Sequence, residues 1–148
     1  MARYSIRLLV AIFAVVLLVG AVRADDGDDL KSLQGKWKPI EANLGDNKID
    51  QEVLDKATVE FADDKYTVTI GEMIEKGAIL LDPKKAPKQM DIFPTQGANN
   101  GKTLWAIYQL EADSLTVCYS LTPGVRPENF DPDTNTLLYV KYQRVKDE

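Results

Sequence analysis

Two apolar runs joined by a short polar link constrain the fold of this chain more than any other feature. The runs occupy residues 103–110 and 115–121, within the stretch KTLWAIYQLEADSLTVCYSLTPGVRPENF at 102–130, and they are rich in β-branched and aromatic side chains. The link between them, at 111–114, is too short to hold a helix. This pattern predicts a β-hairpin, and we expect the rest of the chain to supply further strands of the same sheet.

The rest of the chain shows the same strand-like pattern. Apolar and polar side chains alternate at 58–61 and 66–70, as in strands with one buried face and one face in water. Eight strands are expected, at about 37–42, 58–61, 66–70, 73–81, 89–93, 103–110, 115–121 and 136–145. Because short links pair neighbouring strands antiparallel, the sequence predicts an all-β, eight-stranded antiparallel up-and-down barrel. A β-sandwich is the alternative.

Helix is expected in two short places only. Residues 51–56 predict one short helix, and residues 30–33 predict a single helical turn leading into the first strand. The acidic run Asp-Asp-Gly-Asp-Asp at 25–29 is typical of a solvated chain, so residues 25–32 are expected to form an acidic flexible tether. The barrel domain is therefore expected to occupy residues 33–148.

The first 24 residues have the pattern of a secretory signal peptide. Arg3 and Arg7 form a basic region, an unbroken apolar run follows at 8–19, and Val22 and Ala24 stand at the −3 and −1 positions of a cleavage site. An uncleaved membrane anchor is the alternative, but the apolar run is shorter than the roughly 20 residues that span a bilayer. We expect an exported protein, periplasmic or extracellular after cleavage, with no membrane attachment.

The charge and the cysteine content limit the partners. Cleavage would remove three arginines and leave 15 basic and 23 acidic residues, a net charge of −8. An acidic surface repels phosphate backbones and anionic lipid headgroups, so nucleic acid and membrane surfaces are not expected partners. Cys118 is the only cysteine, so the domain is expected to be held by core packing without an internal disulfide.

Several motifs resemble those of a known family. Gly35-x-Trp37 at the start of the first strand, with Arg144 near the end of the last, is similar to the lipocalin-type barrel signature. The segments LDPKKAPKQMDIFPTQG, GKTLWAIYQL, LTVCYS, PGVRPENF and YQRV follow in order between residues 81 and 145. Together they resemble an exported lipocalin-like domain family of unknown function, found in planctomycete-type bacteria, over residues 33–145. The chain departs from this family at Trp105-Ala106 and at Gln109. The resemblance implies a barrel fold and export, and it implies no activity.

Strand parity places three of these residues at one end of the barrel. Arg144 shares a face with Tyr142 and Val140, so it ends on the core side of the last strand. In a closed antiparallel barrel the first and last strands are neighbours. We therefore expect the guanidinium of Arg144 to stack on the indole of Trp37, next to Gly35, and to close the barrel structurally, a contact worth roughly 0.5–2 kcal/mol.

No catalytic or metal signature is present. The sequence contains no histidine, which excludes Ser-His-Asp and Cys-His arrangements and the usual zinc sites. The segment GANNGKT at 97–103 has three residues between its glycines where a P-loop has four. Residues 131–135 resemble the start of a calcium loop, but Thr136 and Tyr142 stand where Gly and Glu are required. We expect no catalytic residue, no metal and no cofactor.

The candidate ligand site is the barrel interior. Strand parity places a set of residues on inward faces: Phe61, Tyr66, Val68, Ile79, Tyr108, Val117, Tyr119 and Val140. From these and one loop residue we predict ligand contacts at Tyr66, Val68, Ile79, Tyr108, Tyr119 and Arg126. Arg126 lies in a Pro-flanked loop and could face an anionic ligand group. The favoured alternative is that it pairs with an acid such as Glu128 or Asp131 and fixes the loop.

Two functions fit these observations. The first is a non-catalytic binding module that holds a small apolar or amphipathic ligand in the barrel. The second is a structural or protein–protein interaction domain with a filled core. An enzyme is the third and least supported function, because the absence of histidine leaves few groups for acid–base or nucleophilic chemistry.

Overall fold

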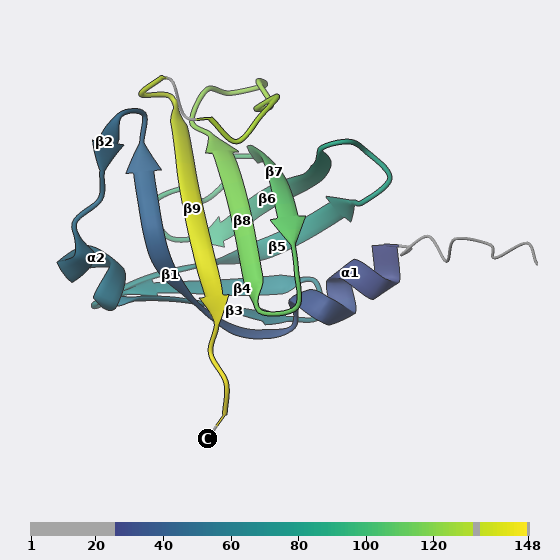
Figure 1. Cartoon of the computed structure of the whole chain (residues 1–148), viewed down its shortest axis with the longest axis horizontal. Coiled ribbons are helices and arrows are strands. Elements are labelled where there is room, and N and C mark those ends of the chain that lie inside the picture. The colour runs from purple at the N-terminus through teal and green to yellow at the C-terminus, as the bar shows by residue number, and fades with distance from the viewer. Residues whose placement is uncertain (1–25, 132–133, 148) are drawn as a thin grey trace, which may run out of the picture.

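A computed structural model describes residues 26–131 and 134–147. The signal peptide predicted for residues 1–24 lies outside this range. The described part of the chain forms two helices and nine strands, drawn in Figure 1. They are α1 (Asp26–Leu33), β1 (Gly35–Leu44), β2 (Asn47–Lys48), α2 (Gln51–Asp55), β3 (Ala57–Ala62), β4 (Lys65–Ile70), β5 (Met73–Asp82), β6 (Lys88–Gln96), β7 (Leu104–Leu110), β8 (Ser114–Ser120) and β9 (Leu137–Arg144).

The strands form a closed antiparallel barrel of eight strands with one extra strand. From β3 to β9 each strand pairs with its neighbour in sequence, and β1 pairs with both β3 and β9. This closure confirms the up-and-down barrel and excludes the sandwich. The hairpin predicted from the two apolar runs is β7–β8, in which Leu110 pairs with Leu115.

The strands differ most from the prediction in two places. Asn47 and Lys48, which lie outside the predicted strands, pair with the end of β1 and form the additional short strand β2. Strand β6 was predicted to stop before Pro94 but continues to Gln96. The β5–β6 register shifts beside Pro94, between Lys76 and Gly77. Such a bulge accommodates a residue without a backbone N–H.

The prediction of a flexible tether over residues 25–32 is wrong for the described part of that segment, which forms helix α1. Leu33 has no exposed surface and joins the core, and Asp29 is 7% exposed. The Asp29 carboxylate accepts a hydrogen bond of 2.6 Å from the Tyr108 hydroxyl and lies 2.9 Å from the Lys88 ammonium. These contacts attach α1 to strands β6 and β7 and make it part of the barrel domain.

Trp37 and Arg144 meet as expected at the α1 end of the barrel. The two residues pair directly across β1 and β9, and the Arg144 guanidinium carbon lies 4.2 Å from the centre of the Trp37 ring. The indole N–H donates to the Leu33 carbonyl at 2.8 Å, and Arg144 Nη1 donates to the Gln34 carbonyl at 2.7 Å. Gly35 has a φ of +106°, a conformation that favours glycine and turns the chain from α1 into β1. This end, which we call the base, is therefore closed.

Candidate functional site

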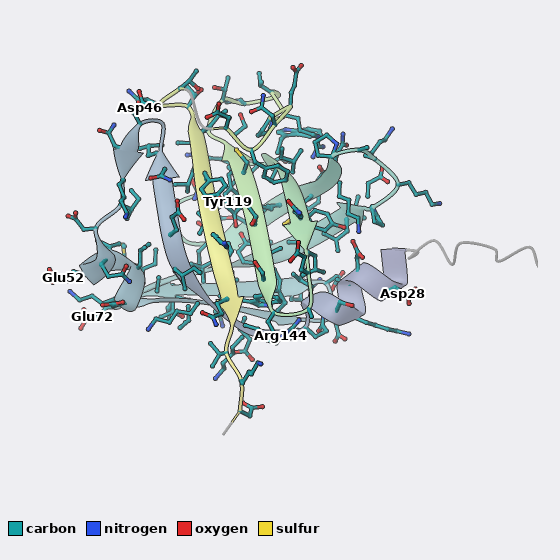
Figure 2. The ribbon with its side chains drawn as sticks, in the orientation of Figure 1. Asp28, Asp46, Glu52, Glu72, Tyr119 and Arg144 are labelled. Carbon is teal, nitrogen blue, oxygen red and sulfur yellow. The ribbon has the colours of Figure 1, made fainter. Side chains whose placement is uncertain are left out.

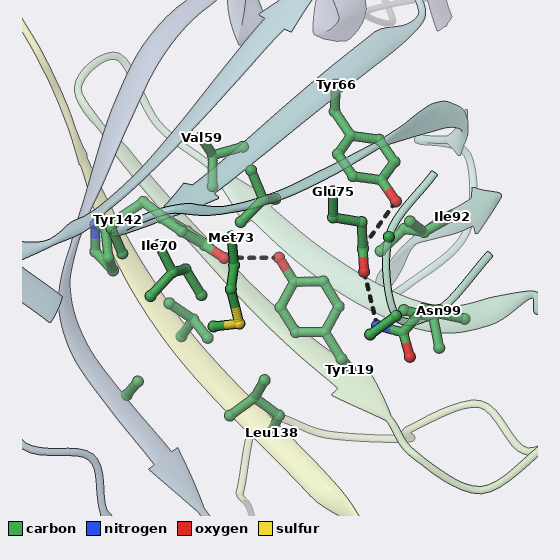
Figure 3. Close-up of a pocket in the computed structure, with 18 of the residues that line it drawn as sticks. Val59, Tyr66, Ile70, Met73, Glu75, Ile92, Asn99, Tyr119, Leu138 and Tyr142 are labelled. Atoms are coloured by element: carbon green, nitrogen blue, oxygen red, sulfur yellow. Dashed lines mark hydrogen bonds between the residues drawn. The ribbon is translucent and has the colours of Figure 1, made fainter. Parts of the chain in front are cut away.

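The barrel interior contains an apolar cavity of about 680 Å³. Its wall is formed mainly by aliphatic and aromatic side chains from the eight strands of the barrel, and Figure 3 shows the cavity in close-up. The apolar wall residues of the strands include Ala42, Val59, Phe61, Val68, Ile70, Ile79, Met90, Ile92, Leu138 and Val140. The volume lies in the range of roughly 300–1,000 Å³ that is usual for ligand pockets. The barrel is hollow.

Four large apolar residues that line the cavity are also exposed, and they mark its mouth. Val53, Met73, Ile74 and Leu121 are 44%, 68%, 46% and 48% exposed. Val53 belongs to α2, Met73 and Ile74 begin β5, and Leu121 follows β8. Helix α2 lies at the opposite side of the molecule from α1 (Figure 1). The mouth is therefore at the end opposite the base.

A hydrogen-bonded group of three polar residues lies in the wall near the mouth. The Tyr66 hydroxyl donates to Glu75 Oε1 at 3.0 Å, and the Asn99 amide donates to Glu75 Oε2 at 2.8 Å. Strand β5 has a glycine beside this group, Gly77, and a Cβ there would lie 2.8 Å from the Tyr66 ring. Only glycine leaves room for the ring in the position that directs its hydroxyl to Glu75.

A second polar pair faces the cavity from strands β8 and β9. The hydroxyls of Tyr119 and Tyr142 lie 2.9 Å apart. Burial raises the pKa of Tyr142 to about 12 and raises the pKa of Tyr119 well above its usual value. Both phenols are therefore neutral at physiological pH, and the pair offers the cavity hydrogen-bonding groups without charge.

Four of the six predicted ligand residues line the cavity, and two do not. Tyr66, Val68, Ile79 and Tyr119 belong to the wall. Tyr108 also points to the core side of its strand, but it is 1% exposed at the base and bonds to Asp29, away from the cavity. Of the other residues predicted to face inward, Phe61 and Val140 line the cavity, whereas Val117 is packed within the core.

Arg126 is not among the residues that line the cavity, so the structure does not bring it together with the other predicted ligand residues. Its Nη2 lies 2.5 Å from Asp91 Oδ1, and its Nη1 donates to the Ala106 carbonyl at 2.8 Å. Its guanidinium carbon lies 4.7 Å from the centre of the Trp105 ring. The favoured alternative, that an acid holds Arg126 and fixes the loop, is correct in kind. The acid is Asp91 of β6, a residue distant in sequence, in place of Glu128 or Asp131.

Three polar residues of the wall were missed from sequence. The parity that places Gly77 and Ile79 on one face extends to Glu75 and could have identified it. Tyr142 was placed on the core side in the argument about Arg144, but it was not taken as a ligand residue. Asn99 lies in the loop between β6 and β7, where no periodic pattern predicts the direction of a side chain.

Cys118 is expected to be chemically inert in the folded protein. It has no exposed surface, and burial raises the pKa of its thiol to about 11, so the reactive thiolate is scarce at pH 8. We expect a thiol reagent such as 5,5′-dithiobis(2-nitrobenzoic acid) to modify native protein at least about 100-fold more slowly than urea-unfolded protein, judged from thiolate fraction and access. Comparable rates at pH 8, measured by absorbance, would contradict this.

The described residues were compared with the requirements of a metal site and of a membrane-spanning helix. The described residues contain no group of three or more Cys, Asp or Glu side chains placed to hold a metal ion. None of the described helices is long and apolar enough to cross a membrane. Asp133 of the calcium-like segment lies outside the described residues.

Comparison with known proteins gives a limited result. No family profile and no curated protein matches the sequence significantly. One crystal structure, of a DUF4847 family protein from Bacteroides vulgatus, is similar with a TM-score of 0.48 and 13% sequence identity. The likeness covers 78% of this chain and 96% of that protein.

Proposed function

We propose that this protein is a non-catalytic binding module that holds one small apolar or amphipathic ligand inside its barrel. The cavity of about 680 Å³ carries the proposal, because it joins an apolar wall to a mouth between exposed apolar side chains. A barrel with a purely structural or protein-interaction role and a filled core would leave no space of this size. The alternative of a filled barrel is therefore the weaker one.

The chemistry of the described residues supports a role without catalysis. The sequence has no histidine to act as a base near neutral pH. Burial raises the pKa of Cys118 and of the wall residues Tyr119 and Tyr142, which makes these groups poor nucleophiles and poor acids. The cavity groups are thus suited to contact a ligand without reacting with it.

The proposal extends to the compartment and the family. The pattern of residues 1–24 supports export, with the mature protein in the periplasm or outside the cell. Kinship with the exported lipocalin-like family is part of the same proposal. It is supported by the Gly35-x-Trp37 motif and by the stacked position of Arg144.

A cavity-filling variant tests the binding function. Val68 lines the cavity from β4, whereas its neighbour Thr67 pairs with Glu60 and Lys76 on the outer face. We expect Val68→Trp to weaken binding of the neutral probe N-phenyl-1-naphthylamine at least about 10-fold, because the indole occupies the ligand space. Thr67→Trp adds the same bulk outside and should leave the affinity unchanged.

Two results would count against the binding function. One is a wild-type protein that does not bind the probe in a fluorescence titration. The other is a Val68→Trp protein that keeps the wild-type circular dichroism spectrum and binds the probe as tightly as Thr67→Trp. Native mass spectrometry of protein isolated without detergent gives an independent measurement, since a bound small molecule adds a discrete mass.

A further inference from the structure

Within the described part of the chain, the cavity wall contains a single charged side chain. Among the described residues that line the cavity, Glu75 alone carries a formal charge, and the other polar side chains are the neutral amide of Asn99 and the neutral phenols of three tyrosines. Glu75 lies on the inward face of β5, and Figure 3 shows its carboxylate directed between Tyr66 and Asn99. The charge of the cavity is therefore negative and localised near the mouth.

The Glu75 carboxylate has neutral partners and spare acceptor capacity. Tyr66 and Asn99 each donate one hydrogen bond to it, one to each oxygen. No ion pair within the described part of the chain includes Glu75. A carboxylate has about four lone-pair sites for hydrogen bonds, so about two remain free for a further donor.

The negative charge of Glu75 affects the pKa of two tyrosines of the cavity. Burial, followed by the nearby charge of Glu75, raises the pKa of Tyr66 far above its ordinary value. Glu75 also contributes to the raised pKa of Tyr119 on the other side of the cavity. A carboxylate beside an apolar wall and without a counter-charge is unfavourable, and a cation in the cavity would remove this imbalance.

Charges outside the cavity act in the same direction. Figure 2 shows Glu52 and Glu72 at the α2 side of the molecule, where the mouth lies. Lys56 pairs with Glu52 at 2.9 Å, so Glu72, in the turn next to Met73, is the carboxylate that adds negative potential at the rim. The whole sequence carries a net charge of −5. This field favours the approach of a cation over that of an anion.

We propose that the ligand is a cationic amphiphile, with a protonated amine bound to Glu75 and an apolar chain lying against the aliphatic wall of the barrel. This inference rests on the proposed binding function and names the ligand class of the same cavity. An ammonium group offers three N–H donors, enough to occupy the roughly two free acceptor sites of Glu75. The cation predicted for an anionic ligand, Arg126, is bound to Asp91 and does not reach the cavity.

A series of three compounds with the same ten-carbon chain tests the ligand class. Decylamine is cationic at pH 7, decanol is neutral and decanoate is anionic, and each is titrated into the protein by calorimetry below its micelle-forming concentration. We expect wild-type protein to bind decylamine at least about 10-fold more tightly than decanol, and decanoate most weakly. The preference arises because, of the three compounds, only the protonated amine carries a positive charge that balances the negative charge of the Glu75 carboxylate.

Matched variants locate the source of the preference. Glu75→Gln keeps the size of the side chain and removes its charge, and it should weaken decylamine binding about 10-fold while decanol binding stays unchanged. Glu60→Gln makes the same change of net charge on the outer face of β3, where Glu60 is exposed, and should bind all three compounds as wild type does. Thermal melting followed by circular dichroism establishes that both variants are folded.

The outcomes separate this inference from the binding function. If decanol and decanoate bind as tightly as decylamine, or if Glu75→Gln keeps the preference for the amine, the ligand class is wrong and the binding function stands. If no compound binds wild-type protein, and N-phenyl-1-naphthylamine does not bind either, the binding function fails and the ligand class fails with it.

Discussion

Replacing Trp37 by alanine is expected to lower the free energy of unfolding by about 3–5 kcal/mol. Trp37 has no exposed surface, and it is among the largest fully buried side chains of the barrel. The substitution removes its packing in the core, its hydrogen bond to the Leu33 carbonyl and the ring on which Arg144 stacks. Urea unfolding followed by far-ultraviolet circular dichroism measures the loss of free energy. Thermal melting should show a fall in Tm of more than about 10 °C for a domain of this size.

The second tryptophan provides the matched control. Trp105 is half-buried on β7 and contacts the guanidinium of Arg126. Trp105→Ala removes the same side chain from a partly solvated position, so we expect a loss of about 0.5–2 kcal/mol from the ring contact and its burial. Equal losses for the two variants, or unchanged melting of Trp37→Ala, would show that the base of the barrel is not held by this stack.

Much of the barrel could be predicted because the patterns that specify its strands lie within short stretches of the sequence. The alternation at 58–61 and 66–70 fixes which side chains of β3 and β4 face inward, and the short links fix the antiparallel order of the strands. The contact between Trp37 and Arg144 follows from parity together with closure. Each of these steps uses residues close in sequence or at the two ends of a closed sheet.

Only the last turn of helix α1, at 30–33, could be predicted, because the contacts that stabilise the first half of the helix are distant in sequence. Five of the residues at 25–29 are acidic or glycine, which is the composition of a solvated segment. The partners that make Asp29 a buried residue, Lys88 and Tyr108, lie 59 and 79 positions away. The same limit explains Arg126, since Asp91 lies 35 positions from it, whereas the predicted acids were its near neighbours.

The presence of a cavity in the barrel could not be predicted from the directions of individual side chains. Parity indicates which side chains face inward, but the free volume depends on how their summed size compares with the width of the closed barrel. Bulky inward residues such as Phe61, Tyr66 and Tyr119 were compatible with a filled core. In the structure they line a cavity, and their positions around its wall leave space between them.

Replacing Leu33 by alanine is expected to lower the free energy of unfolding by about 2–5 kcal/mol. Leu33 lies at the end of α1, has no exposed surface and belongs to the core cluster that includes Trp37. If α1 did not pack on the barrel, this substitution would have no effect, because the Leu33 side chain would be in water in both the folded and the unfolded states. Urea unfolding therefore distinguishes an N-terminal helix that closes the base from a linker that merely precedes the barrel.

The control for this variant comes from the same helix. Lys31 is exposed on α1, two positions before Leu33, and Lys31→Ala should change the free energy of unfolding by no more than about 0.5 kcal/mol. A large loss at Leu33 with none at Lys31 is the pattern of one buried helix face. If both variants unfold at the wild-type urea concentration, α1 does not contribute to the core of the barrel domain.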